Sequence, residues 1–425
     1  ELGEPWPTAF VHALLCLGPP YGVVGPLCKQ GNDRILTHDF VHRTHLEIFS
    51  MNHYPPALVD NWMDDWISWT YTQRRTITAK NITVDHGSLG TQSTRYNVDR
   101  RNAQLLPELV NKGYANVSQY MRQTLRLPES DVASFDSARA AVKGLAPPMA
   151  PLSSLDHCGA PVTTTITTAT SVSVPTTTHA SSVESLFKDK HFISVAGQLA
   201  AMRRSGAIFL KDVLLITASV KIEVASKFST KHATCLKYIQ DYEIEPGKSW
   251  GKLTEALKSE WGKLRCDFLL VDIVRALDSA TASQHNHCAK ATGSRGLIAI
   301  TMGTTSRGEQ KWGDSINVEH MTLTAVTLPS IVRSVECGFD YVVVIGFDAD
   351  DKFWNQDTFI AQVKQYFDEQ VRQPLARRGI SIQLRLERCE NPLKVPGPVF
   401  NMLSRAAYNL GADFIYRIND DTELG

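Results

Sequence analysis

The last third of this chain alternates apolar segments with amphipathic ones, and this alternation limits its fold more than any other feature. Residues 296–303, 340–347, 380–388 and 412–418 are apolar or alternating runs of strand length, and the stretches between them have helical periodicity. Successive strand–helix units predict an α/β domain with a mainly parallel sheet and helices on both faces. Ligands bind such sheets beyond the carboxyl ends of the strands.

Three residues mark where the helices between these strands bend or end. Pro329 is expected to kink the first helix, because proline lacks a backbone N–H and clashes with the preceding turn. Gly379 and Gly411 follow the next two periodic stretches and are expected to end those helices.

Charge and hydropathy exclude several classes of protein. The chain has 44 basic and 44 acidic residues without a block of either sign, so we expect no nucleic-acid partner. It contains no apolar run of about eighteen residues, so no membrane-spanning helix is expected, and its first residues lack a signal-peptide pattern. The apolar fraction of 43% is ample for hydrophobic cores.

Composition divides the chain into four parts. Residues 129–183 are rich first in Pro and Ala and then in Thr, and we interpret them as a linker because they cannot bury a core. This linker separates residues 1–128 from a small, mostly helical module over 184–290. The α/β segment over 296–425 follows the module.

Several features favour the secretory pathway, either the Golgi lumen or the extracellular space. The Thr-rich tract is typical of O-glycosylated stalks, with a plain flexible linker as the alternative. The sequons Asn81-Ile-Thr and Asn116-Val-Ser would make the chain a glycoprotein. None of the eight cysteines forms a CxxC pair, which argues against a zinc ribbon, and Cys235 and Cys266 are candidates for a disulfide.

Two strand-like runs end in clusters of acids. The run before "RINDDTE" delivers Asp420, Asp421 and Glu423 into one loop, and hard oxygen ligands in this number suit Mg²⁺ or Mn²⁺. In "GFDADD", Asp348 and Asp350 are placed to accept hydrogen bonds from a ribose or a base. A solvated acidic loop is the alternative in both cases.

The segment between these acid clusters carries groups suited to phosphate. Lys394 precedes a Pro-Gly-Pro turn at Gly397, and the helix that starts there presents its N-terminus to anions. Asn401 and Arg405 are four residues apart on that helix and are predicted to share a face, although a surface salt bridge also accounts for Arg405.

Taken in order, these motifs resemble the nucleotide-binding half of a GT-A glycosyltransferase. The resemblance rests on a first strand followed by Thr and Gly, a second ending in Asp, a Gly-x-x-x-Asn-x-x-x-Arg helix, and a strand ending in a metal motif. It implies a Rossmann-like fold, Asp421 as metal ligand, and Asp420 and Glu423 as secondary ligands. "Asn-Asp-Asp" departs from the strict Asp-x-Asp form of that motif. The implied nucleotide-sugar contacts are Thr301, Gly303, Thr304, Asp348, Asp350, Lys394, Gly397, Asn401 and Arg405.

The acceptor half of such an enzyme follows the metal motif, and residues 1–128 read in the expected order. "NWMDDWISWTY" sets Asp64 and Asp65 among aromatic residues, and the resemblance implies that one of them, with Asp65 preferred, deprotonates the acceptor hydroxyl. The alternative is two acids that stabilise a helix N-terminus.

Two further motifs of this half carry polar groups. In "VDHGSLGTQSTRY", His86 is implied as a further metal ligand and Arg95 as a diphosphate contact. His38, His42 and His45 have metal-like spacing, but no HExxH motif occurs and a cleft or core role is favoured over zinc.

The chain thus presents the two halves of one domain in reversed order. Because "ELG" occurs at both ends, we interpret it as a permuted fragment of a tandem-repeat protein and expect the terminal thirds to dock within one chain. The predicted function is a metal-dependent glycosyltransferase of hexosyl type, moving a sugar from a UDP- or GDP-sugar to a glycan or protein hydroxyl. The alternatives are a non-catalytic carbohydrate-binding or interaction protein and a nucleotidyltransferase.

Overall fold

The structure is a computed structural model, and it describes residues 5–29, 34–59, 61–86, 101–140, 150–151, 296–306 and 318–424. All of these belong to one compact unit, built from Glu1–Thr165 and His287–Gly425. A second unit spans Ile166–Asn286 and lies outside the described residues, as do most of the predicted linker and the predicted helical module with Cys235 and Cys266.

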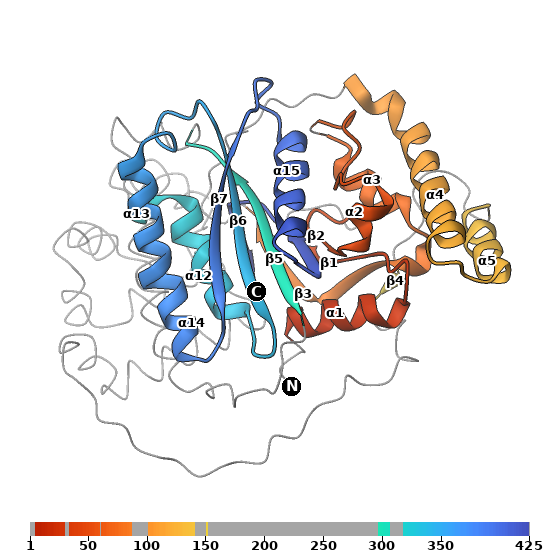
Figure 1. Cartoon of the computed structure of the whole chain (residues 1–425), viewed down its shortest axis with the longest axis horizontal. Coiled ribbons are helices and arrows are strands. Elements are labelled where there is room, and N and C mark those ends of the chain that lie inside the picture. The colour runs from red at the N-terminus through yellow and green to blue at the C-terminus, as the bar shows by residue number, and fades with distance from the viewer. Residues whose placement is uncertain are drawn as a thin grey trace, which may run out of the picture. The chain divides into compact units, whose positions relative to one another are not determined.

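The described residues of this unit form a nine-stranded sheet, which takes strands from both ends of the chain (Figure 1). The strand order is β4-β3-β1-β2-β8-β5-β6-β7, and β9 pairs with β3 beside this path. The strands are β1 (Val23–Cys28), β2 (Asp39–His42), β3 (Thr76–His86), β4 (Ala150–Pro151), β5 (Leu297–Thr304), β6 (Asp340–Asp348), β7 (Ile382–Cys389), β8 (Phe414–Arg417) and β9 (Thr422–Leu424).

The sheet is α/β in class but only partly parallel, whereas the sequence predicts a mainly parallel one. The pairs β5–β6, β6–β7, β5–β8, β1–β3 and β3–β4 are parallel. The pairs β1–β2, β2–β8 and β3–β9 are antiparallel. Two of these antiparallel pairs, β2–β8 and β3–β9, join the N-terminal third to the C-terminal third. The terminal segments therefore dock within one chain through backbone hydrogen bonds.

Two hydrophobic cores lie on opposite faces of the sheet, because successive side chains of a strand point to opposite sides. In β6, Tyr341, Val343 and Ile345 belong to one core, whereas Val342 and Val344 belong to the other. The pattern in "YVVVI" is continuously apolar because both faces are covered.

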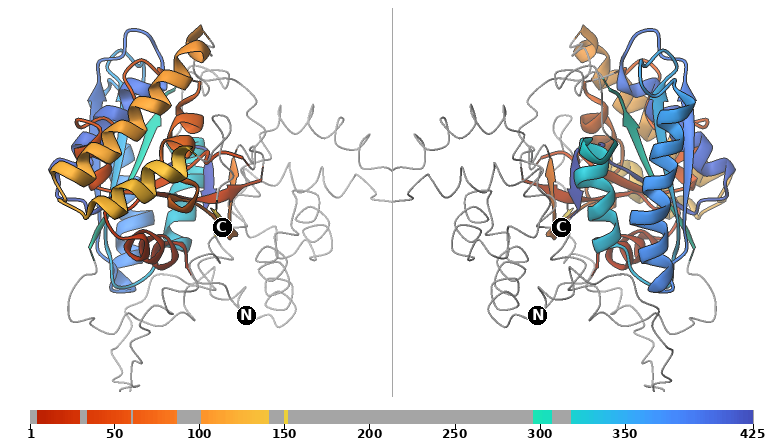
Figure 2. Two further views of the ribbon diagram at one scale, coloured as in Figure 1. Left: turned by 90° about the vertical axis from the view of Figure 1, so that its right-hand side faces the viewer. Right: turned by 90° about the vertical axis from the view of Figure 1, so that its left-hand side faces the viewer.

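Helices pack around the sheet, as Figures 1 and 2 show, and each core is formed with its own set of them. The first core lies under α1 (Trp6–Leu17), α12 (Leu328–Ser334), α13 (Asp357–Phe367) and α14 (Gln373–Arg377). The second lies under α2 (Thr44–Ile48), α3 (Met63–Thr70), α4 (Leu106–Gln123), α5 (Glu129–Ala140) and α15 (Pro396–Asn409).

The helix breakers act close to where the sequence places them. A π-helical turn over Leu323–Thr327 precedes α12, whose first turn contains Pro329. Gly379 and Gly411 adopt positive φ angles of 79° and 86°, the left-handed conformation that follows a helix and that glycine adopts without strain. A second π-helical turn, Asp368–Arg372, separates α13 from α14.

The start of the predicted linker is a packed helix. α5 begins at Glu129, and its Val132 and Phe135 are buried in the second core. Phe135 also contacts the ring of Tyr114 in α4. Among the described side chains of α5, Val132 and Phe135 are the buried apolar ones, which is why composition makes this stretch resemble a linker.

α15 also ties the two terminal thirds together by polar contacts. The Asn401 side chain accepts a hydrogen bond from the Tyr54 backbone N–H at 2.8 Å and donates one to the Tyr54 carbonyl at 3.0 Å. Gly397 donates its N–H to the Val59 carbonyl at 2.8 Å, and a Cβ at Gly397 would lie 2.6 Å from the Leu58 carbonyl oxygen. Gly397 is therefore needed for close packing.

Replacing Asn401 by Ala should destabilise the sheet unit by about 2–4 kcal/mol, because two buried backbone groups of Tyr54 lose their partner. Arg405→Ala, four residues away on the exposed side of α15, should change the free energy of unfolding by less than about 0.5 kcal/mol. Urea unfolding of the full chain measures both. An Asn401→Ala variant of unchanged stability but weaker nucleotide binding would restore the role that the sequence predicts.

Candidate functional site

The acidic loop after β8 is held in place by threonines from neighbouring elements. Asp420 is only 5% exposed and Asp421 9%. The Thr304 hydroxyl, at the end of β5, donates a hydrogen bond to Asp420 Oδ2 at 2.7 Å, and the Thr327 hydroxyl donates to the Asp420 carbonyl at 2.8 Å. β5 and β8 are parallel neighbours, so their carboxyl ends meet here. Thr304 thus positions an acidic side chain.

The same loop continues into β9, which brings the end of β3 alongside it. The antiparallel register sets His86 opposite Thr422 and Asp85 opposite Glu423. Because His86 pairs with Thr422, its backbone lies close in space to that of Asp421, although 335 positions separate the two residues in the sequence (421 − 86). Glu423, predicted as a secondary metal ligand, instead forms an ion pair with Arg333 of α12 at 2.8 Å.

His38 supports this loop from the other side. Its Nε2 lies 2.8 Å from the Thr422 hydroxyl, and the Asn419 backbone N–H donates to that hydroxyl at 3.3 Å. His42 and His45 have other partners: the Thr44 hydroxyl at 2.6 Å and the Tyr71 hydroxyl at 2.8 Å. Burial lowers the pKa of His42 to about 4 and that of His45 to about 3. The three histidines therefore have structural partners.

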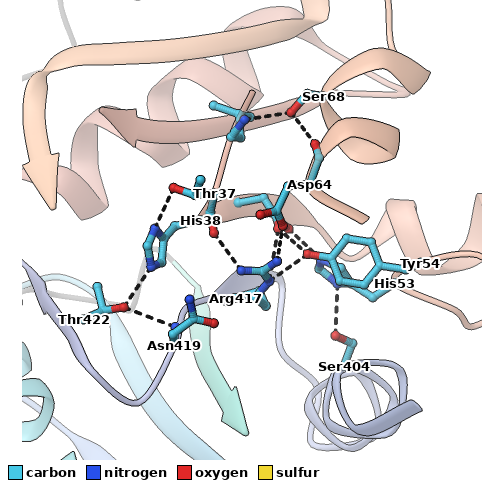
Figure 3. A network of polar contacts seen from close by, with 12 residues as sticks. Thr37, His38, His53, Tyr54, Asp64, Ser68, Ser404, Arg417, Asn419 and Thr422 are labelled. Atoms are coloured by element: carbon cyan, nitrogen blue, oxygen red, sulfur yellow. Dashed lines mark hydrogen bonds and ion pairs between the residues drawn. The ribbon is translucent and has the colours of Figure 1, made fainter. Parts of the chain in front are cut away.

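Arg417, three residues before Asp420 in the sequence, is at the centre of a buried polar network (Figure 3). Arg417 ends β8, is 3% exposed, and donates to the Tyr54 hydroxyl at 2.7 Å and to the Thr37 carbonyl at 2.7 Å. It also pairs with Asp39 at 3.5 Å and donates to Asp64 of α3. All four of these partners come from the N-terminal third.

Asp39 is fully buried at the centre of this network. Its Oδ1 lies 2.5 Å from His53 Nε2, and its Oδ2 accepts a hydrogen bond from the Tyr54 hydroxyl at 2.6 Å. Burial by itself would raise the pKa of Asp39, but His53, Arg417 and Tyr54 outweigh it and lower the pKa to about 2. Asp39 is therefore an ionised partner of Arg417 at neutral pH.

Ser404, His53 and Asp39 form a chain of contacts that resembles a hydrolase triad. The Ser404 hydroxyl lies 3.0 Å from His53 Nδ1, opposite the Asp39 contact. All three residues are 0% exposed, so no substrate can reach the serine. This series of contacts links α15 to β2 and has a structural role. Sequence reasoning did not find it, because the three residues lie in separate motifs.

Asp64 and Asp65 lie in the first turn of α3, and Asp64 accepts a hydrogen bond from Arg417. Burial raises the pKa of Asp64 to about 6, although Arg417 acts in the opposite direction. Burial also raises the pKa of Asp65. Asp64 is engaged by Arg417, which leaves Asp65, half-buried one residue further on, as the better candidate for proton transfer.

The acids at the end of β6 also have hydrogen-bond and ion-pair partners within the fold. Asp348 is buried and accepts a hydrogen bond from Asn391 at 2.9 Å, and Lys394 lies 3.8 Å from its carboxylate. Lys394 also pairs with the exposed Asp350. Lys394 is thus held between two acids at the carboxyl ends of β6 and β7.

Asp351 is the third acid of this strand end, and the sequence makes it a candidate ribose or base contact together with Asp348 and Asp350. In the structure its carboxylate is used within the fold. Its carboxylate accepts hydrogen bonds from the Ser306 hydroxyl at 2.6 Å and the Ser306 backbone N–H at 2.8 Å. It also accepts the backbone N–H groups of Phe353 and Trp354 at 3.0 and 3.1 Å. Asp351 therefore joins the loops after β5 and β6.

The other residues predicted to contact the nucleotide sugar lie in different surroundings. Thr301 is fully buried within β5 and Gly303 lies opposite Gly346 of β6, so neither is at the strand's end. Asn401 and Arg405 lie one turn apart in α15, but Asn401 is buried against Tyr54 whereas Arg405 is exposed. Arg95 lies outside the described residues.

Within the described ranges, no three His, Cys, Asp or Glu side chains are grouped closely enough to hold a metal by themselves. Two adjacent buried carboxylates, Asp420 and Asp421, nevertheless fit one common mode of Mg²⁺ binding, in which one or two carboxylates act together with substrate phosphates. No helix among the described residues has the length and hydropathy to cross a membrane.

A cavity of about 400 Å³ lies between α4 and α5, away from the acidic loop. Its charged groups have protein partners: Arg122 bridges to Asp136 at 2.8 Å, Asp136 accepts a hydrogen bond from the Ser118 hydroxyl at 2.5 Å, and Arg139 donates to the Asn111 side chain at 2.6 Å. We assign no function to it, because these charged groups are already engaged within the fold.

Comparison with known proteins identifies no relative: no protein-family model, no curated protein and no solved structure matches this chain.

The raised pKa of Asp64 predicts a pH dependence of stability. A carboxyl group whose pKa is higher in the folded state contributes stability that is complete below its ordinary value of 3.8 and is lost as pH rises through about 6. At each pH, the stability of the wild type is compared with that of Asp64→Asn as the difference between their free energies of unfolding. This difference should fall by about 1–3 kcal/mol between about pH 4 and 6.5. Thermal unfolding at several pH values measures it, and a constant difference would contradict the prediction.

Proposed function

We propose that this protein is a metal-dependent glycosyltransferase that moves a hexosyl group from a nucleotide-diphosphate sugar, UDP- or GDP-linked, to a hydroxyl of a glycan or protein. One observation carries the proposal. Three segments that are distant in the sequence converge at the carboxyl end of β8: the Asp420–Asp421 loop, the end of β3 with His86, and the start of α3 with Asp64 and Asp65. These are the metal, late-histidine and acceptor motifs of the GT-A resemblance.

The acidic loop suits a hard divalent ion, Mn²⁺ or Mg²⁺, bound together with the donor diphosphate. Asp421 and Asp420 would hold the ion, and His86 is a candidate for a further ligand. Such an ion neutralises the charge that develops on a diphosphate leaving group. Thr304 and Thr327 keep the Asp420 carboxylate and its backbone in one orientation, so little reorganisation is needed on binding.

The acceptor hydroxyl needs a base, and Asp65 is the residue proposed for that role. A half-buried carboxylate with a raised pKa is a stronger base than a solvated one. Asp64 serves as a positioning residue, because its carboxylate is bound to Arg417 and ties α3 to the strand that carries the metal loop.

The donor nucleotide is assigned to the carboxyl ends of β5 and β6. Asp350 and Lys394 are exposed or half-buried there, beside the buried Asp348. Lys394 has a positive φ of 56°, an uncommon conformation for a residue other than glycine that occurs often at functional sites. We assign Lys394 to the diphosphate and Asp350 to the ribose or base.

The secretory pathway remains the proposed location. Cys16 and Cys337 are disulfide-bonded, a state typical of proteins from oxidising compartments. Nucleotide sugars and divalent metals meet secreted acceptors in the Golgi lumen, which is consistent with the proposed reaction.

Asp421→Ala should abolish Mn²⁺-dependent binding of UDP or GDP, because it removes the principal metal ligand. Calorimetry with Mn²⁺ and each nucleotide, on the full chain, measures this. Asp357→Ala at the exposed start of α13 is the matched control and should bind as the wild type does. Binding that is absent in the wild type, or present without metal, would refute the proposal and favour the non-catalytic carbohydrate-binding alternative.

Asp65→Asn should lower the rate of sugar transfer by about 10²–10⁴-fold while leaving Mn²⁺–nucleotide binding unchanged, because the carboxylate is needed only for proton transfer. A panel of UDP- and GDP-sugars with nitrophenyl glycosides as acceptors measures the rate. Equal loss of transfer and of nucleotide binding would instead indicate a structural role for Asp65. Nucleotidyl transfer, seen as release of diphosphate, would favour the nucleotidyltransferase alternative.

A further inference from the structure

We propose that Asn81 is the acceptor of an N-linked glycan and that the second sequon of the chain, at Asn116, is not used. Both sequons satisfy the Asn-x-Ser/Thr pattern, so the sequence does not separate them. The fold places them in very different surroundings. This inference concerns a modification and does not rest on the proposed transferase activity.

Asn81 lies at the centre of a bulge in β3. In the parallel β1–β3 pair, Pro26 is opposite Ala79 but the next residue, Leu27, is opposite Thr83. The three β3 residues between them, Lys80, Asn81 and Ile82, have no partner in β1. A proline lacks the N–H that a sheet ladder uses, which accounts for the break in register at Pro26.

Among the described residues, the strands at the other edge of β3 also do not pair with this bulge. β4 pairs with Ile77 and Thr78, and β9 pairs with residues 84–86, so the partner registers stop on either side of Asn81. Bulges of this kind redirect a side chain out of the regular pleat.

Burial within the bulge supports an outward Asn81. Lys80 and Asn81 are exposed, whereas Ile82 is 6% exposed and packs in the first core. The buried Ile82 anchors the bulge, so a glycan on the Asn81 amide would displace no packed side chain. Thr83, which supplies the sequon hydroxyl, is half-buried.

The Asn116 sequon is in the middle of α4 and is folded into a helix–helix contact. Val117 is fully buried, and Ser118 is 5% exposed with its hydroxyl bonded to Asp136 of α5. The sequon hydroxyl is therefore unavailable once α4 and α5 have packed. Helical backbone also prevents the turn that brings an Asn side chain to the hydroxyl two residues later.

The transfer is chemically balanced with a lipid-linked diphospho-oligosaccharide as the donor. The Asn81 amide nitrogen forms a bond to the anomeric carbon of the first sugar and loses one proton. The bond from that carbon to the phosphate oxygen breaks, and the lipid diphosphate leaves with the electron pair. The secretory pathway supplies this donor, and the disulfide-bonded Cys16 and Cys337 favour the same compartment.

The test is to direct the full chain into the endoplasmic reticulum of cultured cells with an added leader and to treat it with peptide-N-glycosidase F. The wild type and Asn116→Gln should both show the mobility shift of one glycan. Asn81→Gln should show none. Thr83→Val, which keeps the side-chain volume but lacks the hydroxyl, should also show none and guards against a folding defect specific to Asn81→Gln.

Peptide mass spectrometry then locates the site, since the glycosidase converts a glycosylated Asn to Asp. A wild-type chain without a glycan at Asn81 would overturn the proposal. A shift lost in Asn116→Gln, or a second glycan at Asn116, would overturn the exclusion of that sequon.

Discussion

The buried guanidinium of Arg417 is the interaction on which the rest of this structure depends. It is the last residue of β8, in the C-terminal third, and its partners Thr37, Asp39, Tyr54 and Asp64 all come from the N-terminal third. Removing a charge from water costs several kcal/mol, and this cost is offset only when the charge is paired and its remaining N–H groups are hydrogen-bonded. Neither terminal third can therefore bury its half of the network alone, so the charge makes the two segments fold as one unit.

The same network determines where the candidate site is. Arg417 is followed within four residues by Asp420 and Asp421, and its contact to Asp64 brings α3 to the end of β8. The His38–Thr422 and Thr304–Asp420 contacts hold the loop from two sides. A rigid support that fixes two adjacent buried acids would suit the proposed metal loop, since ligands that are oriented before the ion binds need little reorganisation. The proposed chemistry and the stability of the sheet thus share residues.

Parts of this architecture could be predicted from local sequence because local rules govern them. β6 was recognisable from "YVVVI", and α15 from its apolar spacing and from Gly411 after its last turn. Non-local contacts gave no such signal. Asn401 and Glu423 were assigned to ligands because their residue types suit nucleotides and metals, but Tyr54 and Arg333 are their partners. No pattern within either motif encodes a partner that lies in another part of the chain.

By itself, the sequence determined the class of fold, the helix ends and the positions of acids after strands, because hydrophobic period and backbone conformation are properties of neighbouring residues. Only the tertiary structure decided the mixed direction of the sheet, the use of Asp64 by Arg417 and the burial of the Ser404–His53–Asp39 chain. It also separated the exposed bulge at Asn81 from the packed helix at Asn116. These features depend on which buried polar groups form hydrogen bonds with each other. Such partners meet only when residues far apart in the chain pack together.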